Sequence, residues 1–132
     1  MSPLSTELEM LLWSALLYIA QILIPAAAAD LRHGVRWGLG NRDEIHPSSG
    51  WEARAERAYR NMAESLLPFA CVVIALEAGG LNGAMSALGA TVFLFSRLTY
   101  AVLYLAGVTV LRSIAYMAGL IGIGLVVYQM LF

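Results

Sequence analysis

The chain has 132 residues, of which 60% are hydrophobic and 13% are charged, and its formal net charge is −1. Soluble domains average about 45–50% apolar and about 25% charged residues, so this composition excludes an ordinary soluble protein and indicates an integral membrane protein. The near-neutral charge gives no sign of a nucleic-acid partner, and the length allows one small domain over residues 1–132.

Four apolar stretches are long enough to cross a bilayer as helices. The first has 22 residues, which make about 33 Å of helix against a hydrocarbon core of about 30 Å. The second is longer than one bilayer, so we expect its first turns to project from the core. The sequence therefore predicts an all-α, four-helix transmembrane bundle with spans at about residues 8–29, 51–78, 84–105 and 112–131.

The distribution of arginine predicts the orientation of this bundle. Six of the eight basic residues lie between Arg32 and Arg60, and Arg112 lies near the third connection. Cytoplasmic loops carry an excess of basic residues, so we expect the arginine-rich loop at residues 30–50 to be cytoplasmic. Four spans then place both termini on the same side of the membrane, facing outward.

Polar side chains form a stripe along the start of the second span. Arg54, Arg57, Asn61, Glu64 and Pro68 are spaced 3, 4, 3 and 4 residues apart, so at about 100° per residue they share an arc of roughly 80°. Ionisable groups at membrane depth usually face a bundle interior or a water-filled cavity and mark a site. The alternative is a basic patch that contacts anionic lipid headgroups, which accounts for the arginines but not for the amide and the carboxylate.

The third span carries a second polar face. Arg97, Tyr100 and Tyr104 recur at positions i, i+3 and i+7, which share one side of a helix. With the stripe they could bind a small zwitterionic or anionic ligand beside a lipid-soluble one, because arginine binds carboxylates through charge-assisted bonds. Residue spacing alone supports equally well an Arg–Glu network that holds the four helices in register.

Three smaller features complete the prediction from the residues. Glycines in the last span, Gly119, Gly122 and Gly124, predict close contact with another helix. Cys71 is the only cysteine, and its apolar surroundings predict a buried side chain rather than a nucleophile. His33 and His46 stand near a loop without a cluster of metal ligands, so we expect no metal site.

Two motifs in the second, third and fourth spans resemble a known family. The segment RAERAYRNMAESLLPF at residues 54–69 looks like the second-helix signature of the MAPEG superfamily, the membrane-associated proteins in eicosanoid and glutathione metabolism. The segments RLTYAVLY at residues 97–104 and RSIAY at residues 112–116 are similar to the branch of microsomal prostaglandin E synthase and microsomal glutathione transferase. The resemblance implies a bacterial-type member in the inner membrane, assembled as a homotrimer with glutathione between neighbouring subunits.

The resemblance also implies roles for individual residues. Those that would hold the glutathione backbone, directly or by assisting, are Arg57, Arg60, Asn61, Glu64, Arg97, Tyr100 and Tyr104. Arg112 would stabilise the thiolate, and Ser113 occupies a position proposed to assist the chemistry. Two departures stand out: Tyr100 replaces the histidine of that branch, and no tyrosine follows Glu64 directly.

The expected function is a glutathione-dependent membrane transferase or peroxidase that acts on lipophilic electrophiles. Its partners would be other copies of the chain, membrane lipids and a lipophilic small-molecule substrate. The alternative is a non-catalytic membrane scaffold or lipid-binding protein that keeps the fold. A small proton-driven exporter is disfavoured, because the first span has no acidic residue at membrane depth.

Overall fold

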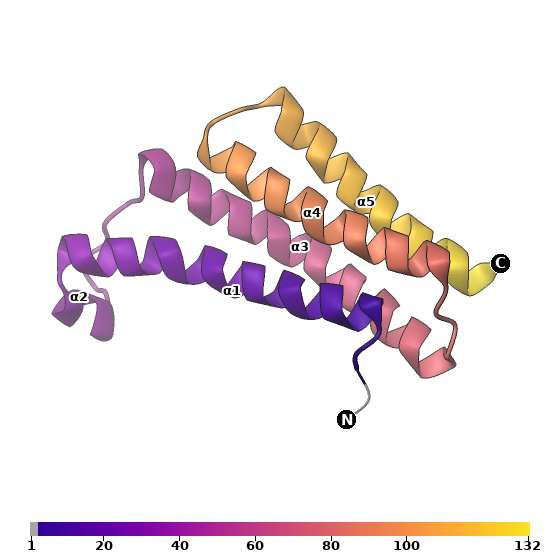
Figure 1. The fold of residues 1–132 in the computed structure, drawn as a ribbon. Helices are drawn as coiled ribbons and strands as arrows, with labels where there is room; N and C mark the ends of the chain where they lie inside the picture. The colour runs from indigo at the N-terminus through magenta and orange to yellow at the C-terminus, as the bar shows by residue number, and fades with distance from the viewer. Residues whose placement is uncertain (1–2) are drawn as a thin grey trace.

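The computed structural model describes residues 3–132, which form five helices and no strand (Figure 1). Four of the helices are long and apolar enough to cross a membrane. The five helices are α1 (Thr6–His33), α2 (Val35–Leu39), α3 (Gly50–Gly79), α4 (Ala84–Leu105) and α5 (Val110–Leu131). The predicted all-α fold with four potential membrane spans is confirmed.

The third predicted span, at residues 84–105, coincides with α4, whereas the other three long helices extend beyond the apolar stretches that predicted them. The first helix begins at Thr6, where the Ser5 hydroxyl accepts a hydrogen bond from the Leu8 amide at 3.2 Å. It ends at His33, because Gly34 turns the chain with a φ of 96°. A span predicted to start at residue 112 starts at Val110, and the short helix α2 was not predicted. Hydropathy reports the lipid-facing segment, whereas backbone hydrogen bonding continues through polar residues until a cap stops it.

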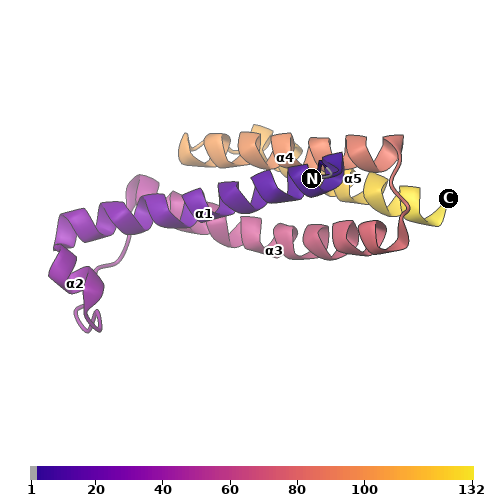
Figure 2. The same cartoon turned by 60° about the horizontal axis from the view of Figure 1, so that its bottom comes forward.

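The long helices run alternately up and down the bundle. In Figure 1, α1 begins at the end of the bundle where α5 ends, and α2 projects at the opposite end. Figure 2 shows α1 seated along α3 and α4. The last helix packs mainly on α4 and partly on α3, and it makes no contact with α1 in the described part of the chain. One side of the bundle therefore consists of α3, α4 and α5 without cover from α1.

A small aromatic and aliphatic core joins α3 to α4. The Phe69 and Phe93 rings stack with their centres 3.9 Å apart. Their fully buried neighbours are Met62, Val73, Leu76, Ala90 and Val126. Because lipid is as apolar as these side chains, close packing rather than exclusion of water holds the helices together.

The contact between α4 and α5 depends on two glycines. A Cβ on Gly89 would lie 2.4 Å from the Gly122 carbonyl oxygen, and a Cβ on Gly122 would lie 2.6 Å from the Gly89 carbonyl oxygen. The prediction of close contact is confirmed at Gly122, and at Gly119 an added Cβ would meet Arg97 at 3.4 Å. At Gly124 an added Cβ would meet nothing within 4 Å, so no helix of the same chain makes the predicted contact there.

Polar contacts tie α1 to its neighbours at both ends of the bundle. At the end where α1 begins, Ser86 donates a hydrogen bond to the buried Glu7 carboxylate, and Ser5 donates one to Glu77. At the other end, the Arg32 guanidinium lies 2.8 Å from the carboxylate of Glu52, whose side chain is almost fully buried. These contacts fix the register of α1 against α3 and α4.

A continuous face of α3 remains uncovered by the chain's other helices. Arg57, Arg60, Glu64 and Pro68 are exposed along it. Cys71 is exposed as well, so the prediction of a buried cysteine is wrong. It lies seven residues after Glu64 on the same side of the helix, a side that no other helix of the chain covers.

Candidate functional site

An open groove lies between α3, α4 and α5 and has a volume of about 350 Å³. This volume falls within the range of about 300–1,000 Å³ that is usual for small-molecule sites. The residues that line it are Asn61, Tyr100, Tyr104, Arg112, Ser113, Tyr116 and Met117. Five of them are site residues predicted from the sequence, so folding brings together segments from three different helices.

Tyr104 stands between two guanidinium groups. The Arg57 Nε–H donates a hydrogen bond to the Tyr104 hydroxyl at 3.1 Å, and the Arg57 guanidinium carbon lies 5.9 Å from the centre of the ring. The guanidinium carbon of Arg112 lies over the same ring at 4.2 Å. The ring therefore orients both cations, since guanidinium groups are attracted to the face of an aromatic ring, and Arg112 is held where it lines the groove.

Arg97 lies behind the groove wall rather than in the groove. It is 1% exposed, and its Nη2 donates a hydrogen bond to Asn61 Oδ1 at 2.7 Å. Its guanidinium carbon lies 4.3 Å from the centre of the Tyr100 ring and 5.6 Å from that of Tyr116. Its Nε donates to the sulfur of Met62 at 3.4 Å. Arg97 thus contacts three residues of the groove lining without reaching its surface.

Arg60 and Glu64 do not line the groove of the single chain. Both side chains are exposed on α3. The ion pairs within residues 3–132 are Arg32–Glu52, Arg42–Asp30 and His46–Glu44, and none of them includes a predicted site residue. Within residues 3–132 the predicted site residues therefore form no Arg–Glu network, and the Arg–Glu pair that helps fix the register is Arg32–Glu52, outside the site.

Two residues of the groove, Tyr116 and Met117, were not assigned a role from the sequence. Tyr116 follows Arg112 by four residues and Met117 follows Ser113 by four residues, so the helical repeat places each pair on one face. The ring centres of Tyr100 and Tyr116 are 6.2 Å apart, and those of Tyr100 and Tyr104 are 5.5 Å apart. Three phenol rings thus line a groove that contains no acidic side chain.

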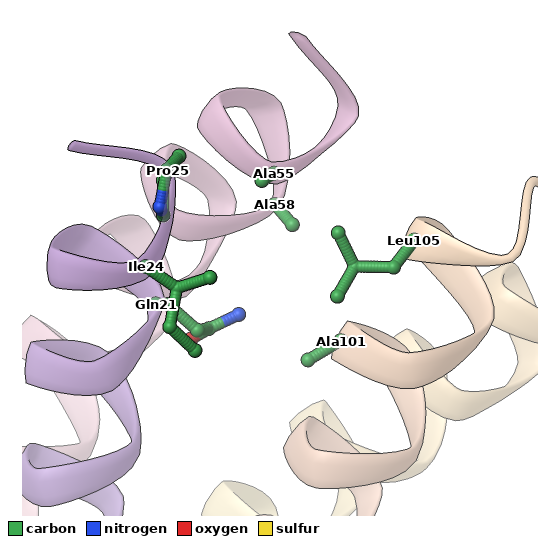
Figure 3. A pocket seen from close by; sticks show the side chains of 7 residues that line it. All are labelled: Gln21, Ile24, Pro25, Ala55, Ala58, Ala101 and Leu105. Atoms are coloured by element: carbon green, nitrogen blue, oxygen red, sulfur yellow. The ribbon is translucent and has the colours of Figure 1, made fainter. Parts of the chain in front are cut away.

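Two other cavities differ from the groove in chemistry. One, of about 50 Å³, lies between α1, α3 and α4, and Figure 3 shows that the Gln21 amide points into it among apolar side chains. It is too small for a peptide. The other is an apolar groove of about 490 Å³ between α4 and α5, lined by residues that include Phe95, Leu103, Leu111 and Ile114. Neither contains a charged residue.

The groove between α3, α4 and α5 is suited to an anionic ligand near one membrane surface. Counting back about 20 residues, the length of a span, from the end of α3 at Gly79 reaches Arg60. A hydrocarbon core that ends at Gly79 would therefore have Asn61 and Glu64 just inside its other edge. The guanidinium of Arg112, the amide of Asn61 and the hydroxyl groups of Tyr104 and Ser113 supply hydrogen-bond donors, and the positive charge of Arg112 favours a carboxylate or a thiolate.

The sequence comparisons agree with this architecture. A family model described as MAPEG family matches residues 10–132, which include both motifs and all four long helices except the start of α1. No curated protein sequence and no solved structure matches the chain. The branch within the superfamily stays a prediction. With four apolar helices of spanning length and a match over almost its full length, the chain is an integral membrane protein that belongs to the MAPEG family.

Proposed function

We propose that the protein is a glutathione-dependent membrane transferase or peroxidase that acts on lipophilic electrophiles. The observation that carries the proposal is the groove in which Arg112, held over Tyr104, lies beside Ser113 and Asn61. Membership of the MAPEG family supports a membrane function related to glutathione or eicosanoids.

The charged side chains on α3 beside the groove are complementary to the charges of glutathione. The tripeptide carries two carboxylates and one ammonium group. Arg57 and Arg60 on α3 present guanidinium groups that can bind carboxylates, and arginine does so through two parallel hydrogen bonds where geometry allows. Glu64, exposed and without an ion-pair partner within residues 3–132, is available to accept from the ammonium group.

Arg112 supplies the chemistry that the thiol needs. A thiol with a pKa of about 8.5 is only about 3% thiolate at pH 7. A guanidinium near the sulfur favours the charged form and raises this fraction. In the transferase reaction the thiolate sulfur attacks an electrophilic carbon. The electron pair of the bond that breaks departs with a leaving group or stays on an atom of the electrophile, which is then protonated. In the peroxidase reaction the thiolate attacks one peroxide oxygen, the O–O bond breaks, and the other oxygen leaves as an alcohol once it is protonated. A second glutathione then reacts with the resulting sulfenic acid to give the disulfide and water.

A homotrimer is part of the proposal. The uncovered face of α3 carries Arg57, Arg60 and Glu64, and a charged group at membrane depth, such as Glu64, is costly unless protein or water surrounds it. A neighbouring copy packed against this face would cover the groove and complete the site with exposed groups of both chains. Native mass spectrometry of the purified protein should therefore show three copies, and a monomer would contradict this part of the proposal.

The lipophilic substrate would reach the protein from the bilayer. The apolar groove between α4 and α5, at about 490 Å³, supports contact with a lipid-soluble molecule. The same groove favours the second candidate function, a lipid-binding protein that keeps the fold without turnover. The two functions differ in whether a thiol binds in the polar groove.

Glutathione titration decides between these functions. Isothermal titration should show saturable binding at millimolar glutathione or below, and a conjugation assay with a lipophilic aryl halide should show turnover. Glu64→Ala should weaken binding by about tenfold, since a charge-assisted hydrogen bond is lost. Arg36→Ala, a change at an exposed residue of α2, serves as the control and should bind as the wild type does. If the wild-type protein neither binds glutathione nor shows turnover, the transferase or peroxidase function is contradicted and the lipid-binding function remains.

We also propose that the arginine-rich loop is cytoplasmic and that both termini face outward, in the inner membrane of a bacterium. The arginines at residues 32–60 support this orientation. With Cys71 replaced by Ser, Asn41→Cys in the exposed loop should react with a membrane-impermeant maleimide only after the membrane is opened. Leu81→Cys, in the connection between α3 and α4, should react in intact cells. The reverse pattern would contradict the orientation.

A further inference from the structure

We propose that Arg97 is a positioning residue that prepares the groove for a thiolate, by holding the Asn61 amide in one orientation and by placing a positive charge behind the groove wall. The inference rests on the proposed function, because it concerns binding of the same thiol. It assigns Arg97 a role different from direct contact with glutathione.

Burial excludes direct contact as the role of Arg97 in this structure. The side chain is 1% exposed, and the Asn61, Tyr100 and Tyr116 side chains, which it contacts, form the groove wall between it and a ligand. The Cδ of Arg97 lies 3.4 Å from the place that a Cβ on Gly119 would take. The stem of the arginine therefore lies against α5, which helps to enclose it.

The hydrogen bond to Asn61 determines what the amide presents to the groove. Arg97 Nη2 donates to Asn61 Oδ1 at 2.7 Å, which requires the oxygen to face the guanidinium. The amide nitrogen, with its two hydrogens, must then face the other way. Asn61 therefore acts as a hydrogen-bond donor in the groove, and a donor suits a carboxylate, a peptide carbonyl or a thiolate. Without Arg97 the amide could rotate and present its oxygen, which would repel the same ligand groups.

The charge of Arg97 has no anionic partner within residues 3–132. Its neighbours are an amide oxygen, a thioether sulfur and two phenol rings, and its Nη1 has no hydrogen-bond partner. Arg97 lies 13 residues from the start of α4 at Ala84, which places it about 20 Å along the helix and within the hydrocarbon core. In such a low-dielectric region an unbalanced cation attracts an anion across a thin wall far more strongly than it would in water.

Two arginines therefore act on the ligand from different positions. Arg112 lines the groove and can bond to the sulfur, whereas Arg97 acts through Asn61 and through its electric field. The two effects of Arg97 can be separated, because a lysine would keep the charge but lacks the fork that lets Arg97 bond to Asn61 and Met62 together.

The test compares Arg97→Met and Arg97→Lys in the complete membrane protein. Two quantities are measured: the dissociation constant of glutathione by calorimetry, and the pKa of the bound thiol by titration of thiolate absorbance. Arg97→Met, which has a similar length and no charge, should weaken binding by about tenfold and raise the pKa of the bound thiol by about one unit. Arg97→Lys should weaken binding to a similar degree but leave the thiol pKa close to its wild-type value.

A double-mutant cycle with Asn61 tests the positioning role. If Arg97 acts on binding through the amide, Arg97→Lys should weaken binding much less in an Asn61→Ala background than in the wild type, since contacting residues do not contribute additively. A merely structural role would lower thermal stability in both backgrounds and leave the thiol pKa unchanged. Arg36→Gln removes a positive charge from the exposed helix α2 and should change neither quantity.

Three other outcomes would also decide whether Arg97 is a positioning residue. Wild-type binding constants and thiol pKa in both folded Arg97 variants would overturn it while leaving the proposed function intact. Failure of the wild type to bind glutathione would overturn both. If Arg97→Met does not fold, Arg97→Lys still decides the positioning role, because wild-type affinity in that variant contradicts it.

Discussion

Arg112→Ala is expected to lower turnover by about 10²–10³, which is the usual effect of removing one donor that stabilises developing negative charge. The physical reason is that Arg112 lines the groove and its guanidinium is held 4.2 Å over the Tyr104 ring, so its charge is fixed before the ligand arrives. The pKa of the bound thiol should rise, because the nearby cation that favours the thiolate is lost. Stopped-flow kinetics with a lipophilic electrophile and absorbance titration of the bound thiol measure the two effects.

Two further variants show whether Arg112 acts on chemistry rather than on binding. Glu64→Ala should mainly raise the dissociation constant of glutathione, whereas Arg112→Ala should mainly lower the rate constant at saturating glutathione. Arg112→Lys keeps the charge without the planar fork and should recover only part of the rate. The alternative role for Arg112 is structural: its side chain would reach up to lipid phosphates and take no part in the chemistry. It would be supported by an Arg112→Ala protein that folds, binds glutathione and titrates like the wild type.

Gly122→Leu is expected to prevent α5 from docking on α4. Even a Cβ at this position would lie 2.6 Å from the Gly89 carbonyl oxygen and 2.9 Å from the Phe93 amide nitrogen. These are backbone atoms of α4, so no side chain can move aside and the two helices must separate. Overpacking of a core typically lowers the free energy of unfolding by about 1–3 kcal/mol, and for Gly122→Leu we expect a decrease at the upper end of that range or beyond. The midpoint of thermal unfolding in detergent, with the yield of purified protein, measures the effect.

Gly124→Leu provides the matched control on the same helix. An added Cβ at Gly124 meets nothing within 4 Å, and leucine favours a helix over glycine by somewhat less than 1 kcal/mol. The unfolding midpoint of this variant should therefore equal or slightly exceed that of the wild type. Equal loss of stability in both variants would mean that lipid-facing or intersubunit packing, not the contact with Gly89, sets the requirement for glycine.

The glycine contact also matters for the groove. Gly89 and Gly122 set the distance between α4 and α5, and Arg112 and Ser113 lie on the turn of α5 that faces Tyr104. Any Gly122→Leu protein that folds should therefore bind glutathione less well, since its Arg112 would no longer lie over the Tyr104 ring.

The sequence by itself determined the number of long helices and their approximate positions. A segment of about 20 apolar residues can satisfy its backbone in lipid only by forming a helix, and this requirement depends on local composition alone. The sequence also determined which side chains share a face, because the repeat of 3.6 residues is a property of the single helix. The grouping of Arg97, Tyr100 and Tyr104 followed from this repeat.

Only the tertiary structure decided which neighbour covers each face. Helical periodicity places Arg57 and Cys71 on one side of α3, but only the arrangement of the other helices leaves that side uncovered. The same holds for the glycines, since Gly122 meets the backbone of α4 and Gly124 meets nothing. Arg97 is the clearest case, because the sequence left open whether it binds a ligand or joins an Arg–Glu network. The structure instead encloses it behind Asn61 and two tyrosines, since burial depends on contacts between segments far apart in the chain.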